Sequence, residues 1–163
     1  MSRRSELREP EVNTNHLLGQ AHARLQRRVL AGVVDAGHRV RPAHSAVFVH
    51  IDSEGTRLTD LAERARMTPQ AMGELVDDLV ELGYVARTPD PSDRRAKLIV
   101  LTDLGYDALQ AAFDTIIGIE AELEALLGRN GLLRLRSALR RIAELDEGAE
   151  TSASARGRSA GRP

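Results

Sequence analysis

Apolar residues recur at intervals of three and four along several stretches of this chain, with polar residues between them. This spacing places the apolar side chains on one face and is typical of amphipathic helices. It predicts helices over about 15–36, 43–51, 60–66, 69–82, 103–127 and 132–145. Gly37, Gly83 and Gly128 follow the first, fourth and fifth of these stretches, at positions where glycine commonly ends a helix.

Two short apolar segments, 84–87 and 98–101, depart from the helical pattern and predict the strands of a β-hairpin. Residues 89–93 between them are proline, aspartate and serine, which are typical of turns. A very short strand is expected at 56–58. Because two short helices with a tight turn precede the hairpin, the order of elements predicts a winged helix-turn-helix. The expected fold class is mainly α with a small β-hairpin wing.

Three threonines stand where helices are expected to begin. Thr59 is a candidate N-cap for the helix over 60–66, and Thr102 for the helix that follows the hairpin. Thr68 is followed by Pro69, a pair that fits an N-cap and the first helical position. The Thr68 cap should stabilise this helix by about 1 kcal/mol.

Composition excludes several classes of protein. The chain has 163 residues, a net charge of -1 and no cysteine, so neither disulfides nor thiolate chemistry is expected. No apolar run approaches the roughly 20 residues that span a bilayer, and the N-terminus does not resemble a signal peptide. A cytoplasmic protein is expected. Its four aromatic residues are too few for a base-stacking surface.

Candidate catalytic and metal-binding patterns are absent from the sequence. The histidines are His16, His22, His38, His44 and His50. None stands three or four residues from another, so no helix face offers a two-histidine clamp. The sequence also lacks a glycine-rich phosphate loop after a strand and a nucleophile-elbow motif. We therefore expect no enzyme, no cofactor and no metal site.

Residues 58–105 carry the most specific pattern. The segment 58–62 precedes a helical stretch over 67–79, and Leu82-Gly83-Tyr84-Val85 leads into the hairpin. Further on, the chain contains the pattern D-x-R-x-x-x-x-x-L-T, formed by Asp93, Arg95, Leu101 and Thr102. Together these residues resemble the MarR family of bacterial winged-helix transcriptional regulators. The resemblance covers roughly 15–147, and the stretch over 70–75 is similar to an actinobacterial subgroup.

The resemblance implies a homodimer that binds a palindromic operator on double-stranded DNA, as a repressor released by a small ligand. It divides the chain into a helical dimerisation lobe, over 15–51 and 103–147, and a winged helix-turn-helix DNA-binding lobe over 52–102. Residues 1–14 are expected to form a flexible arm and 148–163 a disordered tail. The apolar stripes of the last two predicted helices agree with a dimer, because a single lobe could not bury them and a two-fold partner would cover them.

DNA contacts are expected from the wing and from the start of the helix over 69–82. The family pattern implies that Arg95 enters the minor groove or contacts phosphate, with Asp93 pairing to its guanidinium. Nearby cations would add phosphate contacts, namely Arg94, Lys97 and Arg87 from the hairpin, and Arg57, Arg64 and Arg66. The base-edge candidates are Thr68, Pro69, Gln70, Ala71 and Gly73. Each cluster could instead be ordinary solvated surface.

Two further expectations concern partners. The resemblance implies a crevice for a small aromatic or anionic ligand between the lobes, with His16, His22, His44 and Phe48 as candidate lining residues. The helix over 69–82 carries an acidic set, namely Glu74, Asp77, Asp78 and Glu81. Together with the near-neutral net charge, this set leaves an alternative open, a winged-helix module that binds a protein without direct operator binding.

Overall fold

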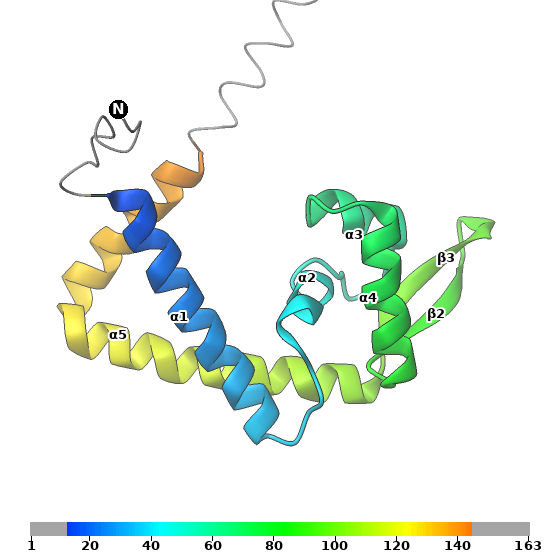
Figure 1. The fold of residues 1–163 in the computed structure, drawn as a ribbon, viewed down its shortest axis with the longest axis horizontal. Helices are drawn as coiled ribbons and strands as arrows, with labels where there is room; N and C mark the ends of the chain where they lie inside the picture. Colours follow the sequence, from blue (N-terminus) through cyan, green and yellow to red (C-terminus); the bar gives the residue numbers. More distant parts are fainter. Residues whose placement is uncertain (1–12, 145–163) are drawn as a thin grey trace, which may run out of the picture. The chain divides into compact units, whose positions relative to one another are not determined.

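The computed structural model describes residues 13–144, so the predictions for the N-terminal arm over 1–12 and for the tail after 144 lie outside the described residues. The elements follow in the order α1 (Thr14–Asp35), η2 (Pro42–His44), α2 (Ser45–Phe48), β1 (Thr56–Arg57), α3 (Leu58–Arg64), α4 (Pro69–Glu81), β2 (Val85–Asp90), β3 (Asp93–Leu101) and α5 (Asp103–Ala143) (Figure 1). The predicted fold class, mainly helical with a small β wing, is confirmed.

The chain divides into two compact units, one through residue 117 and one from residue 118. The first unit holds α1 to β3 and the beginning of α5, and the second holds the rest of α5. A helix break at Gly128, where φ is 67° and ψ is 156°, lies inside the second unit. The sequence predicts this break over 128–131, and the structure confines it to one residue.

The core of the first unit forms where the helix-turn-helix packs on the sheet and on α1 and α5. Its largest fully buried side chains include Leu61 of α3, Met72 and Leu79 of α4, and Ile99 of β3. In α4 the buried positions repeat at three- and four-residue steps, as the sequence pattern requires. This packing fixes one face of α4 inward and leaves the opposite face in solvent.

Two predicted helix starts differ in outcome. Thr68 caps α4, because its hydroxyl accepts a hydrogen bond from the Ala71 N–H at 3.2 Å. The predicted cap at Thr59 is wrong, since α3 begins at Leu58 and its N-cap position is Arg57. Arg57 also belongs to β1, so the chain passes directly from the strand into the helix without the expected cap residue.

The predicted second helix over 43–51 is also shorter than expected. Its place is taken by the 3-10 turn η2 and the four-residue helix α2. The backbone N–H groups of Val49, His50 and Ile51 still bond to carbonyls three and four residues back, so the chain remains coiled beyond α2 without a regular helix.

The hairpin is longer than its sequence pattern indicates. β2 and β3 pair antiparallel from Val85 opposite Leu101 to Pro89 opposite Lys97, and β1 pairs with the other edge of β3. Pro89 is tolerated because β2 is an edge strand, where a missing N–H leaves no ladder bond unmade. The turn is therefore confined to Pro91 and Ser92, and the residues predicted for the tip, Asp93 to Lys97, lie in β3.

The second unit exposes several large apolar side chains. Leu126 is 77% exposed and Leu133 is 53% exposed, and further exposed residues of this kind are Leu127, Leu135, Leu139 and Ile142. So many solvent-facing leucines within the second unit point to a partner surface. Among residues 13–144, no helix is long and apolar enough to cross a membrane.

Candidate nucleic-acid interface

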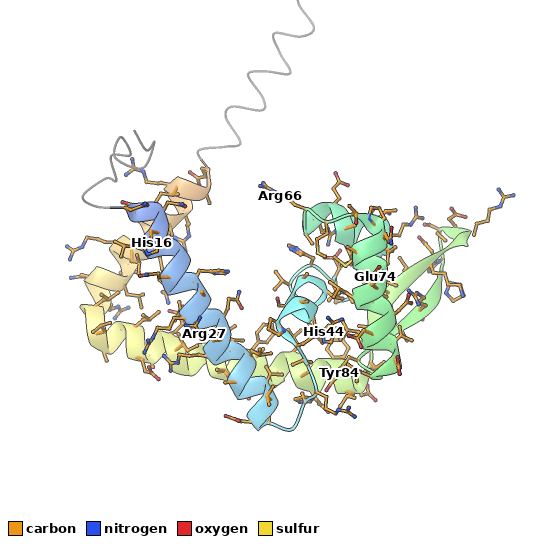
Figure 2. All side chains as sticks on the ribbon, viewed as in Figure 1. His16, Arg27, His44, Arg66, Glu74 and Tyr84 are labelled. Atoms are coloured by element: carbon orange, nitrogen blue, oxygen red, sulfur yellow. The ribbon has the colours of Figure 1, made fainter. Side chains whose placement is uncertain are left out.

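The first turns of α4 present the predicted base-edge residues. Thr68, Pro69 and Gln70 are exposed, while Ala71 and Gly73 are half-buried. One turn further on, Glu74 is exposed on the same side as Gln70, because residues four apart share a helix face. Figure 2 shows Glu74 on α4. The structure thus brings a glutamine amide and a carboxylate together on the open face of this helix.

Two of the four acidic residues of α4 are paired with cations. The Arg87 guanidinium lies 2.6 Å from the Asp77 carboxylate, and that of Arg41 lies 2.6 Å from the Asp78 carboxylate. Glu74 has no ion-pair partner among the described residues. The open face of α4 is therefore less negative than the sequence alone indicates. Arg87, which was predicted to contact phosphate, forms an ion pair with Asp77 of α4.

Two cations of the wing lie on β3 and have no ion-pair partner in the described part of the chain. Arg95 and Lys97 are exposed, and residues two apart in a strand point to the same side. Asp93 accepts a hydrogen bond from the backbone N–H of Arg95 at 3.0 Å, so the carboxylate fixes the backbone there. The sequence predicted a contact with the guanidinium instead. The prediction for Arg94 falls on a side chain outside the described part of the structure.

The turn end of the wing is held by a buried carboxylate that the sequence analysis missed. Asp90 accepts hydrogen bonds from the N–H and the hydroxyl of Ser92, both at 2.7 Å, and from Arg57 Nε at 2.8 Å. The Ser92 bonds, followed by that of Arg57, lower the pKa of Asp90 from 3.8 to about 2. An aspartate two residues before a serine is a known Asx-turn pattern that could have revealed this site.

Arg57 and Arg64 are partly exposed, and each makes contacts within the protein. Arg57 pairs with Asp90, which raises the pKa of its guanidinium. Arg64 binds the Asp52 carboxylate and the His50 carbonyl oxygen, each at 2.8 Å. Both guanidinium groups are thus engaged within the protein, although each side chain stays partly exposed, and their predicted phosphate contacts remain a prediction.

Arg66 differs from these two residues. It is exposed in the turn between α3 and α4 and has a φ of 52°, in the left-handed region that non-glycine residues rarely adopt. Figure 2 shows its side chain reaching out from this turn. No ion pair of Arg66 occurs among the described residues. Together with Arg95 and Lys97, it supplies positive charge available to an outside ligand.

A cavity of about 950 Å³ lies within the first unit. It is lined mainly by apolar side chains of α1, α2 and the beginning of α5, and by three of the four predicted ligand residues, His22, His44 and Phe48. The fourth, His16, is exposed and outside the lining, where its ring contacts the Gln20 amide. Two cations absent from the predictions, Arg27 and Arg41, also line the cavity.

His44 connects this cavity to α4. It is 1% exposed and accepts a hydrogen bond from the Arg41 backbone N–H at Nδ1, 3.3 Å away. Its Nε2 lies 2.9 Å from the Asp78 carboxylate and 3.0 Å from Arg41 Nε. Hydrogen bonds from His44, and then from Arg41, hold the pKa of Asp78 below its usual value. The side chains of Arg41 and His44 thus meet on one carboxylate oxygen.

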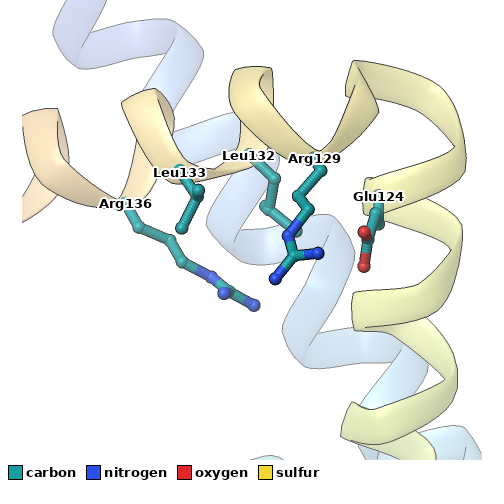
Figure 3. A pocket seen from close by; sticks show the side chains of 5 residues that line it. All are labelled: Glu124, Arg129, Leu132, Leu133 and Arg136. Atoms are coloured by element: carbon teal, nitrogen blue, oxygen red, sulfur yellow. The ribbon is translucent and has the colours of Figure 1, made fainter.

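The second unit contains a smaller hollow of about 360 Å³, on both sides of the helix break at Gly128 (Figure 3). Its lining mixes charged and apolar side chains, namely Glu124, Arg129, Leu132, Leu133 and Arg136. Arg136 also forms an ion pair with Glu120. Across residues 13–144, no group of three or more histidine, aspartate or glutamate side chains is placed to hold a metal ion.

Comparisons with known sequences give one consistent result. A family model described as the MarR family matches residues 40–96. HTH-type transcriptional regulators of Mycobacterium bovis and Mycobacterium tuberculosis are each 35% identical over 78 residues, covering 48% of this chain and 54% of theirs. The matched region thus spans about half the length of these curated relatives.

Solved structures extend the similarity along the chain. The transcriptional repressor CouR, bound to a 23-mer DNA duplex, is 30% identical with a TM-score of 0.68, covering 85% of this chain and 99% of CouR. CouR from Rhodococcus jostii RHA1, bound to p-coumaroyl-CoA, is 28% identical with a TM-score of 0.63, covering 80% and 92%. With the winged helix-turn-helix geometry, these similarities establish that the chain belongs to the MarR family of transcriptional regulators.

Proposed function

We propose that this regulator binds a specific, imperfectly palindromic DNA operator as a homodimer and acts as a repressor that a small ligand releases. Such a protein would act in the cytoplasm, where the chromosome lies. Because the family consists of transcriptional regulators, the prediction of a non-enzymatic protein is confirmed. The observation that carries the proposal is the exposed face of α4 together with the exposed cations Arg66, Arg95 and Lys97, which have no ion-pair partner among residues 13–144.

DNA contact is supported by how charge is distributed, although the net charge is -1. Gln70 can form a bidentate pair with adenine, and Glu74 can accept from a cytosine amino group. Arg95 and Lys97 would contact the minor groove or its phosphates, and Arg66 the backbone beside α4. The structure of the similar repressor CouR with a DNA duplex supports the same use of this fold.

Dimerisation is supported by the apolar residues that the second unit exposes, led by Leu126 and Leu133. Burying such side chains contributes roughly 25 cal/mol per Å² of apolar surface, which favours a partner of the same kind. A two-fold dimer would place two copies of α4 in successive major grooves, about 34 Å apart. The palindromic operator follows from that symmetry.

Ligand release is supported by the cavity of about 950 Å³ in the first unit. Its mostly apolar lining with Arg27 and Arg41 suits a molecule with an apolar body and an anionic group. The similar CouR binds p-coumaroyl-CoA, which has both features. Of the predicted lining residues, His22, His44 and Phe48 remain candidates for this site.

Selection of bound duplexes from fragmented genomic DNA by the purified full-length chain tests the proposal. We expect a recurring sequence with two-fold symmetry, and a gel shift with that duplex. Failure to enrich any duplex at low or moderate salt would contradict operator binding and favour a protein partner for the winged lobe. Size-exclusion chromatography with light scattering tests the dimer separately.

Arg95→Ala tests the wing. The selected duplex should bind this variant more weakly, and the slope of log affinity against log salt should become shallower by about one unit, because one phosphate contact is lost. The matched control is Arg39→Ala, which removes an exposed cation whose backbone N–H binds the Tyr84 hydroxyl, beyond the C-terminal end of α4. An unchanged slope for Arg95→Ala would refute the wing contact.

A further inference from the structure

Arg41 and His44 lie at the boundary between the cavity and α4. Both line the cavity, and both contact a single oxygen of Asp78, a residue of α4 that does not line the cavity. Arg41 Nε and one terminal nitrogen lie 2.8 and 2.6 Å from that oxygen, and His44 Nε2 lies 2.9 Å from it. This cluster is a polar connection from the cavity to the helix that would read DNA.

The two donors differ in how freely they can leave Asp78. His44 is buried, and its ring is also held by the Arg41 backbone N–H. The Arg41 side chain is 55% exposed, so its guanidinium can turn toward another anion at small cost. Arginine binds any planar carboxylate in the same forked geometry. A carboxylate inside the cavity would therefore compete directly with Asp78 for Arg41.

We propose that Arg41 anchors a carboxylate ligand in the cavity by leaving Asp78, and that this exchange passes the presence of the ligand to α4. The inference rests on the proposed ligand site. Once Arg41 leaves, Asp78 keeps only its bond from His44, and its charge loses a cation. Since η2, α2 and α4 are in contact, the last two turns of α4 would then be held less firmly against the wall of the cavity.

Competition between the ligand and Asp78 for Arg41 can be distinguished from a structural role by how variants change ligand affinity. If ligand and Asp78 compete for one guanidinium, then removing the charge of Asp78 must strengthen ligand binding, and removing Arg41 must weaken it. A structural role for the cluster would give the opposite result for Asp78, because any loosening of the cavity wall weakens binding. The two variants Asp78→Asn and Arg41→Gln therefore have effects of opposite sign.

The test measures binding of 3-phenylpropionate, and of its neutral amide, to the full-length chain by isothermal titration calorimetry. Asp78→Asn should bind the carboxylate up to about fivefold more tightly, since an exposed ion pair of this kind is weak. Arg41→Gln should bind it about tenfold more weakly, because a charge-assisted bond is lost. The amide should bind all proteins alike, and the control Arg39→Gln should match the unchanged chain.

Hydrogen exchange provides a second measurement that does not require an operator. Adding the carboxylate should speed amide exchange over the last two turns of α4 in the unchanged chain, and much less so in Asp78→Asn. Weaker carboxylate binding by Asp78→Asn, or no binding to the unchanged chain at millimolar concentration, would overturn the inference. In either case selection of an operator by the unchanged chain would still support DNA binding, so the two failures are distinguishable.

Discussion

Gly105→Ala should destabilise the first unit, because α5 lies directly against the backbone of Tyr84 at Gly105. A Cβ at this position would stand 2.1 Å from the Tyr84 carbonyl oxygen. That oxygen is held in place, since it accepts a hydrogen bond from the backbone N–H of Thr102 at 3.1 Å. The added methyl group must therefore push α5 and Tyr84 apart.

The expected loss of stability is a steric cost reduced by a smaller gain in helix propensity. A carbon and a carbonyl oxygen normally stay at least about 3.3 Å apart, so relief requires a shift of about 1 Å. Overpacking of this kind costs about 1–3 kcal/mol, and we expect the upper part of that range because the opposing atom is backbone. The better helix propensity of alanine returns up to about 1 kcal/mol. The free energy of unfolding should therefore fall by about 2 kcal/mol.

Gly73→Ala is the matched control, because Gly73 is a helical glycine with no heavy atom within 4 Å of its added Cβ. It should stabilise the protein by up to about 1 kcal/mol. Urea unfolding followed by circular dichroism measures both variants, at several protein concentrations because dimerisation would contribute to stability. If Gly105→Ala proves as stable as the unchanged chain, or if both alanines destabilise equally, the close-contact reasoning is refuted.

Three other outcomes are expected from urea unfolding. Thr68→Ala should cost about 1 kcal/mol by removing the cap of α4, whereas Thr59→Ala should cost less, and equal losses would contradict the cap assignment. Asp90 has a pKa lowered to about 2 in the folded chain, so its contribution to stability is complete above 3.8 and disappears as pH falls through about 2. In Asp90→Asn this loss of stability at low pH should be absent. A pH dependence of unfolding equal to that of the unchanged chain would contradict the role of Asp90. Gly32→Ala should destabilise the contact of α1 with α5, because its Cβ would lie 2.0 Å from Thr115 Oγ1. A urea unfolding curve equal to that of Gly73→Ala would disprove this.

Local chemistry explains the predictions that succeeded. The cap of α4 at Thr68 and the helix end near Gly83 depend on a few neighbouring residues, whose conformational preferences the sequence contains directly. The helical stripes likewise follow from spacing along one element. By contrast, the cap predicted at Thr59 is wrong because pairing of β1 with β3 determines where α3 starts, and that pairing joins distant segments.

The candidate site divides in the same way. Which residues form the exposed start of α4 was predictable, since burial of its apolar stripe fixes the opposite face. Which cations remain available was not, because pairing of Arg57 with Asp90 and of Arg87 with Asp77 joins segments far apart in the chain. No spacing rule relates such residues before the chain folds.

The sequence by itself determined the winged helix-turn-helix, the position of its reading helix and the family resemblance, because these depend on short-range pattern. Only the tertiary structure decided which charged side chains form ion pairs within the protein. It paired Asp77 with Arg87 and Asp78 with Arg41, and left Arg66 and Arg95 without ion-pair partners among the described residues. It also connected the cavity to α4 through Arg41 and His44. Ion pairs form between side chains that the fold brings within a few ångströms, and that distance is a property of packing rather than of sequence separation.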